Sequence, residues 1–584
     1  MDHQQVDDPP PITRLGILRI LGILVVLVLV TVVVPLVIAA RSGAFGIPRS
    51  DDWSYLLTLF RFTDTGRISF NNWVSMTLVG QVALTAPVTA LLGRNIRAVQ
   101  VFTAFVGFGG LLTVVALGRR LVGRPAWAVF VAVMVGVSPL WAPLAVSYMT
   151  DIPAFTAGMV TLLCGVIALR RHPVSLGWIV AAMAAGFVAF SIRQYAIVPA
   201  IAVAIVAVWA LAAAGDRRRM RRVLVALGVL LVAAGLVFLW WRGYSNAKSL
   251  SPALPTPHAV WDAILKGTEF IRLLGLLIAP AVLLARPVRL VRNAWRSSPA
   301  VTLVLGGVMS VLQVGIYVHV RATPFVGNYV SRDGVLSRAV LEGERPDVIP
   351  TALFDLLVFV GATVAVLLAV AVVPFVVSLW NRLHTRRFTL DDPAGAAIVL
   401  TVVGYSAAYF VAVVTKLPLY DRYALPFVPL LAFQVLRTSL GLPAAAREPA
   451  RTGVVVGAGV ALALLATVGL VFAVDSAEFD GTRWHVAQLA TDAGYPARKV
   501  NGGFEWVNYH RGTWKQRSAS GELVAARRQG QAQYCVVVVV NPTHVRPGQV
   551  VAREVSELPW RQRAEFVALR TNRSCPAADA RAGR

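Results

Sequence analysis

The sequence predicts an all-α polytopic membrane bundle of about thirteen transmembrane helices, followed by a small α/β domain at the C-terminal end. Three observations predict this fold class. The 584 residues are 57% hydrophobic and only 14% charged, which is too apolar for a soluble protein of this length. The apolar runs are long and unbroken, so they suit helices better than barrel strands, whose residues alternate. Arginines recur in every second connection between the runs.

The apolar runs set the positions of the expected spans. A helix of about 19 residues is long enough to cross the hydrocarbon core of a membrane. With a window of that length, the expected spans are 15–39, 99–118, 126–146, 152–169, 175–191, 196–214, 223–241, 269–285, 300–319, 352–379, 396–414, 423–436 and 453–474. The span at 423–436 is short, and Leu417 and the residues before Arg422 extend it.

The orientation follows from arginine clusters in alternate connections. These are Arg119, Arg120 and Arg124; Arg170 and Arg171; Arg217, Arg218, Arg219, Arg221 and Arg222; Arg286, Arg289, Arg292 and Arg296; Arg382, Arg386 and Arg387; and Arg437, Arg447 and Arg451. Cytoplasmic loops carry an excess of positive charge, so these connections are expected in the cytoplasm. The net charge of +26 therefore reflects topology and does not indicate a nucleic-acid partner.

This orientation divides the chain into three expected parts. Residues 1–13 form a cytoplasmic tail, residues 14–474 the transmembrane domain, and residues 475–584 an extracytoplasmic domain. Arginine greatly outnumbers lysine, which is typical of a bacterium with a GC-rich genome, so we expect a multi-pass protein of the bacterial cytoplasmic membrane. The long outer connections are where function is expected.

The first outer loop, 40–98, contains an apolar segment that does not fit the alternating orientation of the spans. Residues 76–93 are apolar enough to cross the membrane, but Gln81 and Pro87 interrupt them, and a crossing there would invert the pattern of everything before it. We interpret the segment as a juxtamembrane helix lying at the interface. A genuine additional span is the alternative.

Carboxylates mark the outer ends of two spans. Asp51 and Asp52 are adjacent in the first outer loop, where two like charges favour a cation, a basic partner or a proton nearby. Asp151 begins the fourth span. A structural explanation stays open for each, because Asp51 and Asp151 could cap helices, while Trp53 and Tyr55 could belong to the aromatic belt of the membrane interface.

Cationic and polar residues are expected on the same side. They are Arg193, Gln194 and Tyr195 between the fifth and sixth spans, Lys416, Tyr420, Asp421, Arg422 and Tyr423 before the twelfth, and Asn328 and Tyr329 in a glycine- and aromatic-rich outer loop. Basic residues near helix ends commonly just extend toward the interface, but arginine and lysine together would also suit a phosphate.

The C-terminal region predicts a small domain with strands. Val536 to Val540 is a pure β-branched run typical of a buried strand, and Gly502-Gly503 indicates a turn. Cys535 and Cys575 both lie in this region, and a disulfide between them is expected if the region is outside the cytosol. Its simplest role is structural, with acceptor binding as the alternative.

Together these residues resemble the GT-C glycosyltransferases, especially the branch of the protein O-mannosyltransferases and the lipid A aminoarabinose transferase. The motifs are Asp51-Asp52, Thr150-Asp151-Ile152-Pro153, the amphipathic stretch between the first two spans, and Asp421-Arg422-Tyr423. The resemblance covers about the first 440 residues. One departure is that the His-Pro-Pro run of many relatives is absent, so acceptor recognition is expected to differ.

The resemblance implies a polyprenyl-phosphate-linked sugar donor and a catalytic aspartate in the first outer loop. By position, Asp51 or Asp52 would be the base and Asp151 the second acid. The phosphate candidates are Arg193, Lys416 and Arg422. The expected substrate pocket comprises Trp53, Tyr55, Gln194, Tyr195, Asn328, Tyr329 and Tyr420.

The expected reaction moves a sugar to a hydroxyl acceptor in a cell-envelope glycan, lipid or protein at the outer face of the membrane. A magnesium or manganese ion, if one takes part, would bind Asp51 and Asp151; none is required by the sequence. The alternative is a transporter or flippase of lipid-linked saccharides. That function favours ionisable groups near the membrane centre, whereas Glu269 and Asp355, the acids nearest to spans, lie at their outer ends.

Overall fold

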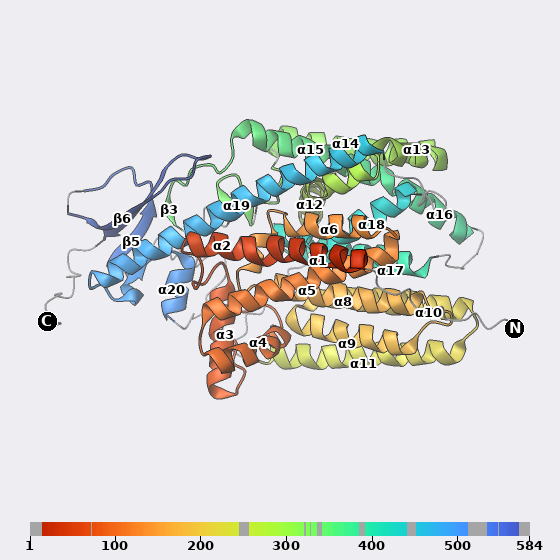
Figure 1. Cartoon of the computed structure of the whole chain (residues 1–584), viewed down its shortest axis with the longest axis horizontal. Coiled ribbons are helices and arrows are strands. Elements are labelled where there is room, and N and C mark those ends of the chain that lie inside the picture. The colour runs from red at the N-terminus through yellow and green to blue at the C-terminus, as the bar shows by residue number, and fades with distance from the viewer. Residues whose placement is uncertain are drawn as a thin grey trace.

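The computed structural model describes residues 14–571 except 72, 245–255, 321–322, 328, 336–340, 385–391, 418, 441–450, 512–533 and 547. The predicted tail 1–13, Asn328 and Cys575 lie outside the described residues. Most helices run along one common axis, and a small group of strands lies beyond one end of the bundle (Figure 1). The predicted combination of a helical bundle with a small C-terminal sheet is confirmed.

The helices follow the predicted apolar runs. In the first half of the chain they are α1 (Arg14–Val28), the π-helical turn η1 (Leu29–Val33), α2 (Val34–Arg41), α3 (Asp52–Thr65), α4 (Val79–Leu92), α5 (Ile96–Val122), α6 (Pro125–Gly136), α7 (Trp141–Ala145), α8 (Asp151–Leu169), α9 (Leu176–Ile192), η2 (Gln194–Ile197), α10 (Val198–Ala213), α11 (Arg217–Arg242) and α12 (Pro257–Leu284). The remaining ones are α13 (Pro287–Ser297), α14 (Pro299–Val320), α15 (Thr351–Ala371), α16 (Val373–His384), α17 (Pro393–Val414), η3 (Asp421–Ala424), α18 (Phe427–Leu440), α19 (Thr452–Asp492), η5 (Ala497–Lys499) and α20 (Phe504–Arg511).

Ten helical segments of the described residues are long and apolar enough to cross a membrane. The predicted runs at 126–146, 175–191 and 423–436 coincide with shorter helices, α6, α9 and α18. The 12 residues of α6 reach only about 18 Å, less than the hydrocarbon thickness of about 30 Å. The structure therefore supports a multi-pass bundle of about ten spans, and the count of thirteen stays a prediction.

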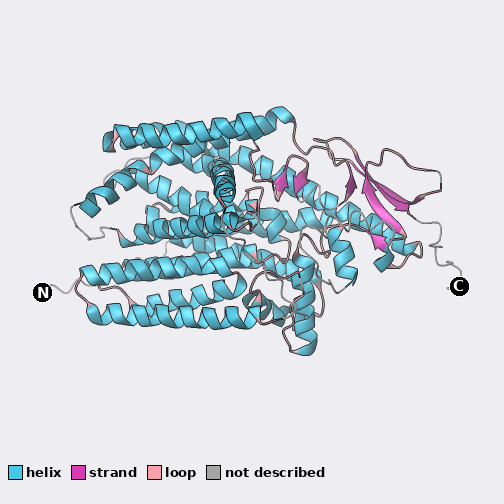
Figure 2. Cartoon of the chain, turned by 180° about the vertical axis from the view of Figure 1, so that it is seen from behind, coloured by secondary structure: helices cyan, strands magenta, loops and turns pink. Residues whose placement is uncertain are grey.

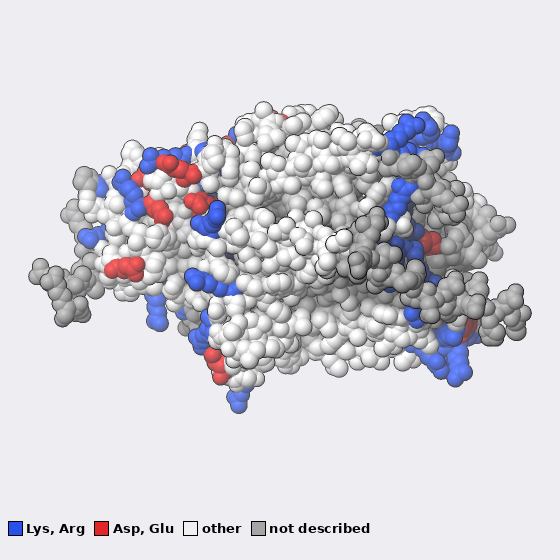
Figure 3. Space-filling model, in the orientation of Figure 1, with Lys and Arg blue, Asp and Glu red and all other residues white. Residues whose placement is uncertain are grey.

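Charge is distributed as expected for a membrane protein. Basic and acidic side chains gather at the two ends of the long axis, and the middle of the visible face is almost free of them (Figure 3). At the end that carries α13, the visible charge is mainly basic, whereas both signs are mixed at the end that carries the sheet (Figures 1 and 3). This is the asymmetry that the alternating arginine clusters predict.

The first outer loop contains two helices that differ from the spans. The helix α3 lies across the common axis of the bundle, at the end where the sheet is (Figure 1). The 14 residues of α4 reach about 21 Å, and Pro87 lies inside the helix. Its Gln81 is buried and donates through Nε2 to the carbonyl oxygen of Tyr148 at 3.0 Å. Both helices are consistent with the predicted juxtamembrane arrangement.

The strands form two sheets, and the larger one lies beyond the end of the bundle (Figure 2). Strands β1 (Val330–Ser331) and β2 (Gly334–Val335) make an antiparallel pair. The larger sheet has the order β3-β5-β7-β6, with β4 also pairing β5, and its members are β3 (Glu342–Gly343), β4 (Val500–Asn501), β5 (Val536–Val540), β6 (Val550–Ser556) and β7 (Ala564–Arg570). All five residues of β5 are buried, so the predicted buried strand is confirmed.

One helix joins the bundle to the larger sheet. The 41 residues of α19 continue without interruption past the predicted domain boundary at residue 475 and then pack against β6 and β7. Strand β3, which comes from the loop before α15, also belongs to this sheet. The C-terminal domain is therefore built onto the bundle from two places in the chain rather than hanging from a linker.

The close approach of α19 to the chain between α6 and α7 gives a test of this packing. A Cβ at Gly469 would overlap the carbonyl oxygen of Val137, so Gly469→Ala is expected to destabilise the protein by about 1 to 3 kcal/mol. Gly457 lies on the same helix with no atom within 4 Å, so Gly457→Ala should leave the melting temperature unchanged or higher. Thermal unfolding of the detergent-purified variants checks this, and equal melting temperatures would contradict the packing.

Candidate active site

Four charged side chains from distant parts of the chain meet near helix ends, at the end of the bundle nearer the sheet. Asp51 precedes the first residue of α3, and Asp151 is the first residue of α8. Arg193 lies between α9 and η2, and Arg422 is the second residue of η3. The sequence predicted all four as site residues, and the structure brings them together.

The contacts centre on Asp151. Arg193 Nη1 lies 2.8 Å from Asp151 Oδ1, and Arg422 Nε lies 3.6 Å from the same oxygen. Arg422 Nη2 also lies 3.6 Å from Asp51 Oδ2, so Arg422 stands between the two carboxylates. Neither oxygen of Asp151 nor Nε of Arg422 makes a hydrogen bond of normal geometry within the described residues. These are ion pairs that leave hydrogen-bonding capacity unused.

Asp51 is the most exposed of the four residues. The side chains of Asp151, Arg193 and Arg422 are 1%, 5% and 3% exposed, whereas the side chain of Asp51 is 25% exposed. Charges taken out of water interact strongly, because water no longer screens them. Asp51 is therefore the carboxylate that an incoming molecule can reach, and the buried charges of Arg422 and Arg193 lie behind it.

Tyrosine rings surround the two guanidinium groups. Arg422 lies 4.4 Å from the ring centre of Tyr420 and 5.4 Å from that of Tyr329. Arg193 lies 4.7 Å from the ring centre of Tyr423 and 5.2 Å from that of Tyr195. A cation over an aromatic face is stabilised without being neutralised, so both arginines keep their charge for a further anion.

Asp52 has a different surrounding from its neighbour Asp51. Its Oδ1 accepts the backbone N–H of Arg49 at 2.6 Å, and its Oδ2 accepts the backbone N–H of Tyr148 at 3.0 Å. The residue is fully buried, and burial raises the pKa of its carboxyl well above the usual range. Asp52 therefore joins the first outer loop to the segment before α8, and both of its oxygens are occupied.

Asp421 fixes the glycine- and aromatic-rich loop that contains Tyr329. Its carboxylate accepts the backbone N–H groups of Val326, of Tyr329 at 3.1 Å and of Val330 at 2.8 Å. Burial raises the pKa of Asp421 to about 6, which still leaves the carboxylate charged at neutral pH. The loop is thereby held in place with Tyr329 against Arg422.

The other predicted pocket residues are placed in different ways. Trp53 and Tyr55 are buried behind the site, and Gln194 donates to the carbonyl oxygen of Ser75 at 3.4 Å. Lys416 is exposed, and within the described residues no ion pair joins it to the cluster. Its assignment as a phosphate ligand stays a prediction. The assignment of Asn328 to the substrate pocket also stays a prediction, because Asn328 is outside the described residues.

Sequence reasoning missed two residues. Trp73 donates its indole N–H to Asp51 Oδ1 at 2.7 Å, and no motif distinguishes it from other interfacial tryptophans. Arg272 on α12 is fully buried, and its guanidinium has no hydrogen-bond partner among the described residues. It is the fourth residue of the predicted span at 269–285 and so lies near the expected outer end of that span, and the expected lack of ionisable groups near the membrane centre stays a prediction.

Neither the predicted metal nor the predicted disulfide is settled by the described residues. These contain no group of three or more His, Cys, Asp or Glu side chains that could hold a metal ion. Asp51 and Asp151 each face an arginine, which does not fit a dedicated cation site. Cys535 is disulfide-bonded and Cys164 is free, while the predicted partner Cys575 lies outside the described residues.

Three solved structures show a similar overall arrangement. An ArnT from Cupriavidus metallidurans bound to undecaprenyl phosphate is 14% identical, with 93% of this chain and 97% of that chain covered and a TM-score of 0.44. The Archaeoglobus fulgidus oligosaccharyltransferase in the apo form is 14% identical, with coverages of 89% and 69% and a TM-score of 0.43. The Archaeoglobus fulgidus AglB with an inhibitory peptide and a dolichol-phosphate is 14% identical, with coverages of 90% and 70% and a TM-score of 0.42.

These proteins are GT-C glycosyltransferases, the kind of protein that the sequence motifs resemble. No protein-family model and no curated protein sequence matches the chain. At these identities and TM-scores the similarity is one of general arrangement. The function proposed below therefore depends on the residues of the site.

The two adjacent aspartates allow a matched test of their roles. Asp52→Asn places an amide where two backbone N–H groups donate to a carboxylate, so it is expected to cost about 2 to 4 kcal/mol of stability. Asp51→Asn keeps an acceptor for Trp73 and should change the melting temperature little. Thermal unfolding of both variants is the measurement. Equal destabilisation would show that Asp52 has no special structural role.

Proposed function

We propose that the chain is a membrane glycosyltransferase that moves a sugar from a polyprenyl-phosphate-linked donor to a hydroxyl acceptor. The observation that carries the proposal is one partly exposed carboxylate, Asp51, beside buried Arg422, whose contacts are long and whose Nε makes no hydrogen bond of normal geometry among the described residues. A base and a phosphate-binding cation are the two groups that this reaction needs. Their place at the end of the bundle suits a donor whose lipid tail stays in the membrane.

Asp51 is the proposed general base. Its carboxylate takes the proton of the acceptor hydroxyl as the acceptor oxygen attacks the anomeric carbon of the sugar. The bond between that carbon and the phosphate oxygen breaks, and the lipid phosphate leaves with the electron pair. Asp51 is preferred to Asp52 because Asp52 is fully buried and accepts two backbone hydrogen bonds.

Arg422 and Arg193 are the proposed phosphate-stabilising residues. The phosphate gains one negative charge when the sugar departs, and Asp51 loses one when it takes the proton. Arg422, which contacts Asp51 at 3.6 Å, is then free to move its interaction from the carboxylate to the phosphate. Asp151 stays ionised and keeps Arg193 and Arg422 close together. No step depends on a magnesium or manganese ion at Asp51 and Asp151, because each of these carboxylates already faces an arginine.

The donor class agrees with ligands of two similar structures, which hold undecaprenyl phosphate and a dolichol-phosphate. The proposed location is the outer face of the cytoplasmic membrane, with the N-terminus in the cytoplasm and the C-terminal domain outside. A cell-envelope glycan, lipid or protein is the proposed acceptor. The arginine clusters of the opposite end support this orientation.

Loss of the proposed base has a matched control on α3. Asp51→Asn is expected to lower the rate of lipid-phosphate release by about 10²- to 10⁴-fold, because the acceptor hydroxyl then has no proton acceptor. Asp64 is an exposed acid near the end of the same helix and pairs with Arg94, so Asp64→Asn should retain the full rate. The measurement is release of free lipid phosphate from candidate polyprenyl-phosphate sugars by the purified protein. Full activity of Asp51→Asn would overturn the assignment.

Arg422 can be tested by comparing two substitutions. Arg422→Lys keeps the charge but not the planar group between two carboxylates, so we expect a reduced kcat with partial activity. Arg422→Gln removes the charge and should lose at least about tenfold more. Single-turnover rates at saturating donor provide the comparison. Equal rates for the two variants would show that the charge of Arg422 is not used.

A flippase for lipid-linked saccharides is the second candidate, and buried Arg272 is the observation that favours it. An unpartnered cation inside a span is the kind of group that transporters use. The two functions differ in their products. A flippase moves the intact donor across a liposome membrane, whereas a transferase releases lipid phosphate without needing two compartments.

A further inference from the structure

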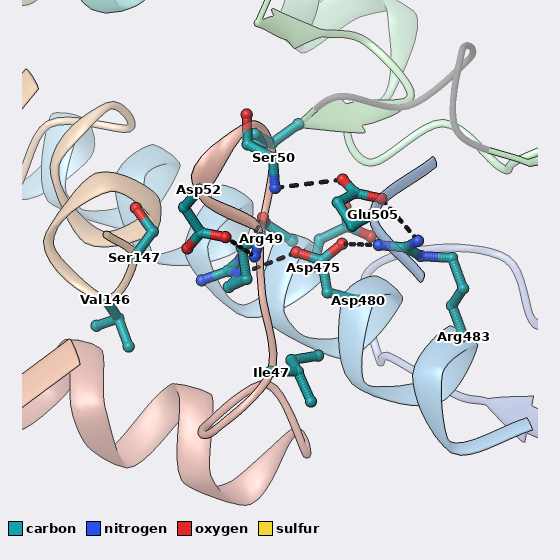
Figure 4. A network of polar contacts seen from close by, with 12 residues as sticks. Ile47, Arg49, Ser50, Asp52, Val146, Ser147, Asp475, Asp480, Arg483 and Glu505 are labelled. Atoms are coloured by element: carbon teal, nitrogen blue, oxygen red, sulfur yellow. Dashed lines mark hydrogen bonds and ion pairs between the residues drawn. The ribbon is translucent and has the colours of Figure 1, made fainter. Parts of the chain in front are cut away.

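Consecutive residues around the proposed base are held by separate parts of the fold (Figure 4). Arg49 contacts α19, with Nε 2.8 Å from Asp480 Oδ2 and Nη2 donating to Ser476 Oγ at 2.7 Å. Asp52 accepts the backbone N–H of Tyr148 from the segment before α8. The residues on both sides of Asp51 are therefore fixed by elements more than ninety residues away in sequence.

Ser50 is held by the C-terminal domain. Its backbone N–H donates to Glu505 Oε1 at 3.2 Å, and Glu505 Oε2 lies 2.8 Å from Arg483 Nη1. Ser50 has a φ of 58°, in the left-handed region that is unfavourable for a residue with a side chain. Such a backbone persists only where its surroundings fix it, and Glu505 on α20 is one of the groups that do so.

Asp51 is also connected to α20, through two aromatic rings. Trp73 donates its indole N–H to Asp51 Oδ1 at 2.7 Å. The ring of Phe504 packs edge-on against Trp73 at 5.2 Å and against Trp53 at 6.0 Å between ring centres. Phe504 directly precedes Glu505, so one turn of α20 contacts the base segment twice.

We propose that α20 of the C-terminal domain positions the general base: Glu505 fixes the backbone before Asp51, and Phe504 fixes the tryptophan that orients its carboxylate. Both are positioning residues, since neither touches Asp51 itself. The inference rests on the proposed function for the identity of the base. It gives the C-terminal domain a part in the active site, whereas the sequence favoured a purely structural role.

The buried ion pairs explain how a peripheral domain can position a side chain accurately. Arg483 bonds Asp480, Glu505 and the carbonyl oxygen of Gly502 at 2.8 to 3.0 Å, so α19 and α20 are rigidly joined. Removing one partner of such a buried pair leaves an uncompensated buried charge and is strongly destabilising. A base displaced by about 1 Å can lose up to about a hundredfold in rate.

The aromatic contact can be tested without breaking the ion pairs. Phe504→Ala removes the ring that supports Trp73, and we expect kcat to fall about tenfold or more with the donor KM unchanged. Phe504→Tyr restores a ring and should recover most of the rate. His510→Ala is the control, because His510 is on the same helix and packs against Trp506 inside the domain.

The backbone contact needs a different pair of variants. Glu505→Gln and Glu505→Ala both remove one of the two carboxylates that pair with Arg483, but only Gln keeps an oxygen that can accept the N–H of Ser50. We expect both to lose stability to a similar extent and Gln to retain several-fold more kcat. Equal kcat values for the two variants would overturn the role of the Ser50 contact.

Hydrogen exchange needs no substrate, so it distinguishes failure of the positioning proposal from failure of the proposed base. Hydrogen exchange of peptides covering residues 47–60 should become faster in Phe504→Ala and Glu505→Ala and remain unchanged in His510→Ala. Unchanged exchange together with wild-type kcat in Phe504→Ala overturns the positioning proposal alone. Faster exchange with an active Asp51→Asn variant instead overturns the proposed base and leaves the mechanical connection standing.

Discussion

Charges that a fold removes from water have to be paired, and this requirement connects distant segments at the end of the bundle that carries the sheet. Asp475 on α19 forms an ion pair with Arg345 from the loop before α15. It forms a second one with Arg561, which follows β6, at 3.0 Å. Asp480, one helical turn further along, pairs with Arg49 and Arg483. These pairs occur only when the loops, the long helix and the sheet are arranged as observed.

The buried charges form two groups, one around α19 and one around Asp151, which differ in the length of their contacts. Around α19, Arg483 and Asp480 form hydrogen bonds of 2.8 to 3.0 Å, as expected for a structural network. Around Asp151, the Arg422 contacts are 3.6 Å long and the carboxylate oxygens lack hydrogen bonds of normal geometry. The group around α19 also has buried atoms without a hydrogen bond of normal geometry among the described residues, including Asp475 Oδ1 and Arg483 Nε. The feature that sets the Asp151 group apart is the long contacts of Arg422, which suit the change of partner in the proposed reaction.

The sequence predicted the helical bundle because hydrophobic length and arginine placement are local properties that each segment displays alone. It also predicted Asp51, Asp151, Arg193 and Arg422, because charged residues at the ends of apolar helices are conspicuous. It did not distinguish Asp51 from Asp52, since their difference depends on the backbone N–H of Tyr148, almost a hundred residues away. Trp73 and Glu505 were missed for the same reason: their partners are defined only by the fold.

The uninterrupted helix α19 fixes the position of the C-terminal domain relative to the bundle. A domain attached through a flexible linker would move independently of the bundle, and its contacts with the first outer loop would open and close. Here one helix of 41 residues belongs to the helical bundle at one end and packs against strands β6 and β7 at the other. Its charged residues meet Arg49 from the first outer loop and Glu505 from α20 within two helical turns of one another. The long helix therefore fixes the domain relative to the membrane bundle. Through α20, the domain in turn fixes the segment that contains Asp51.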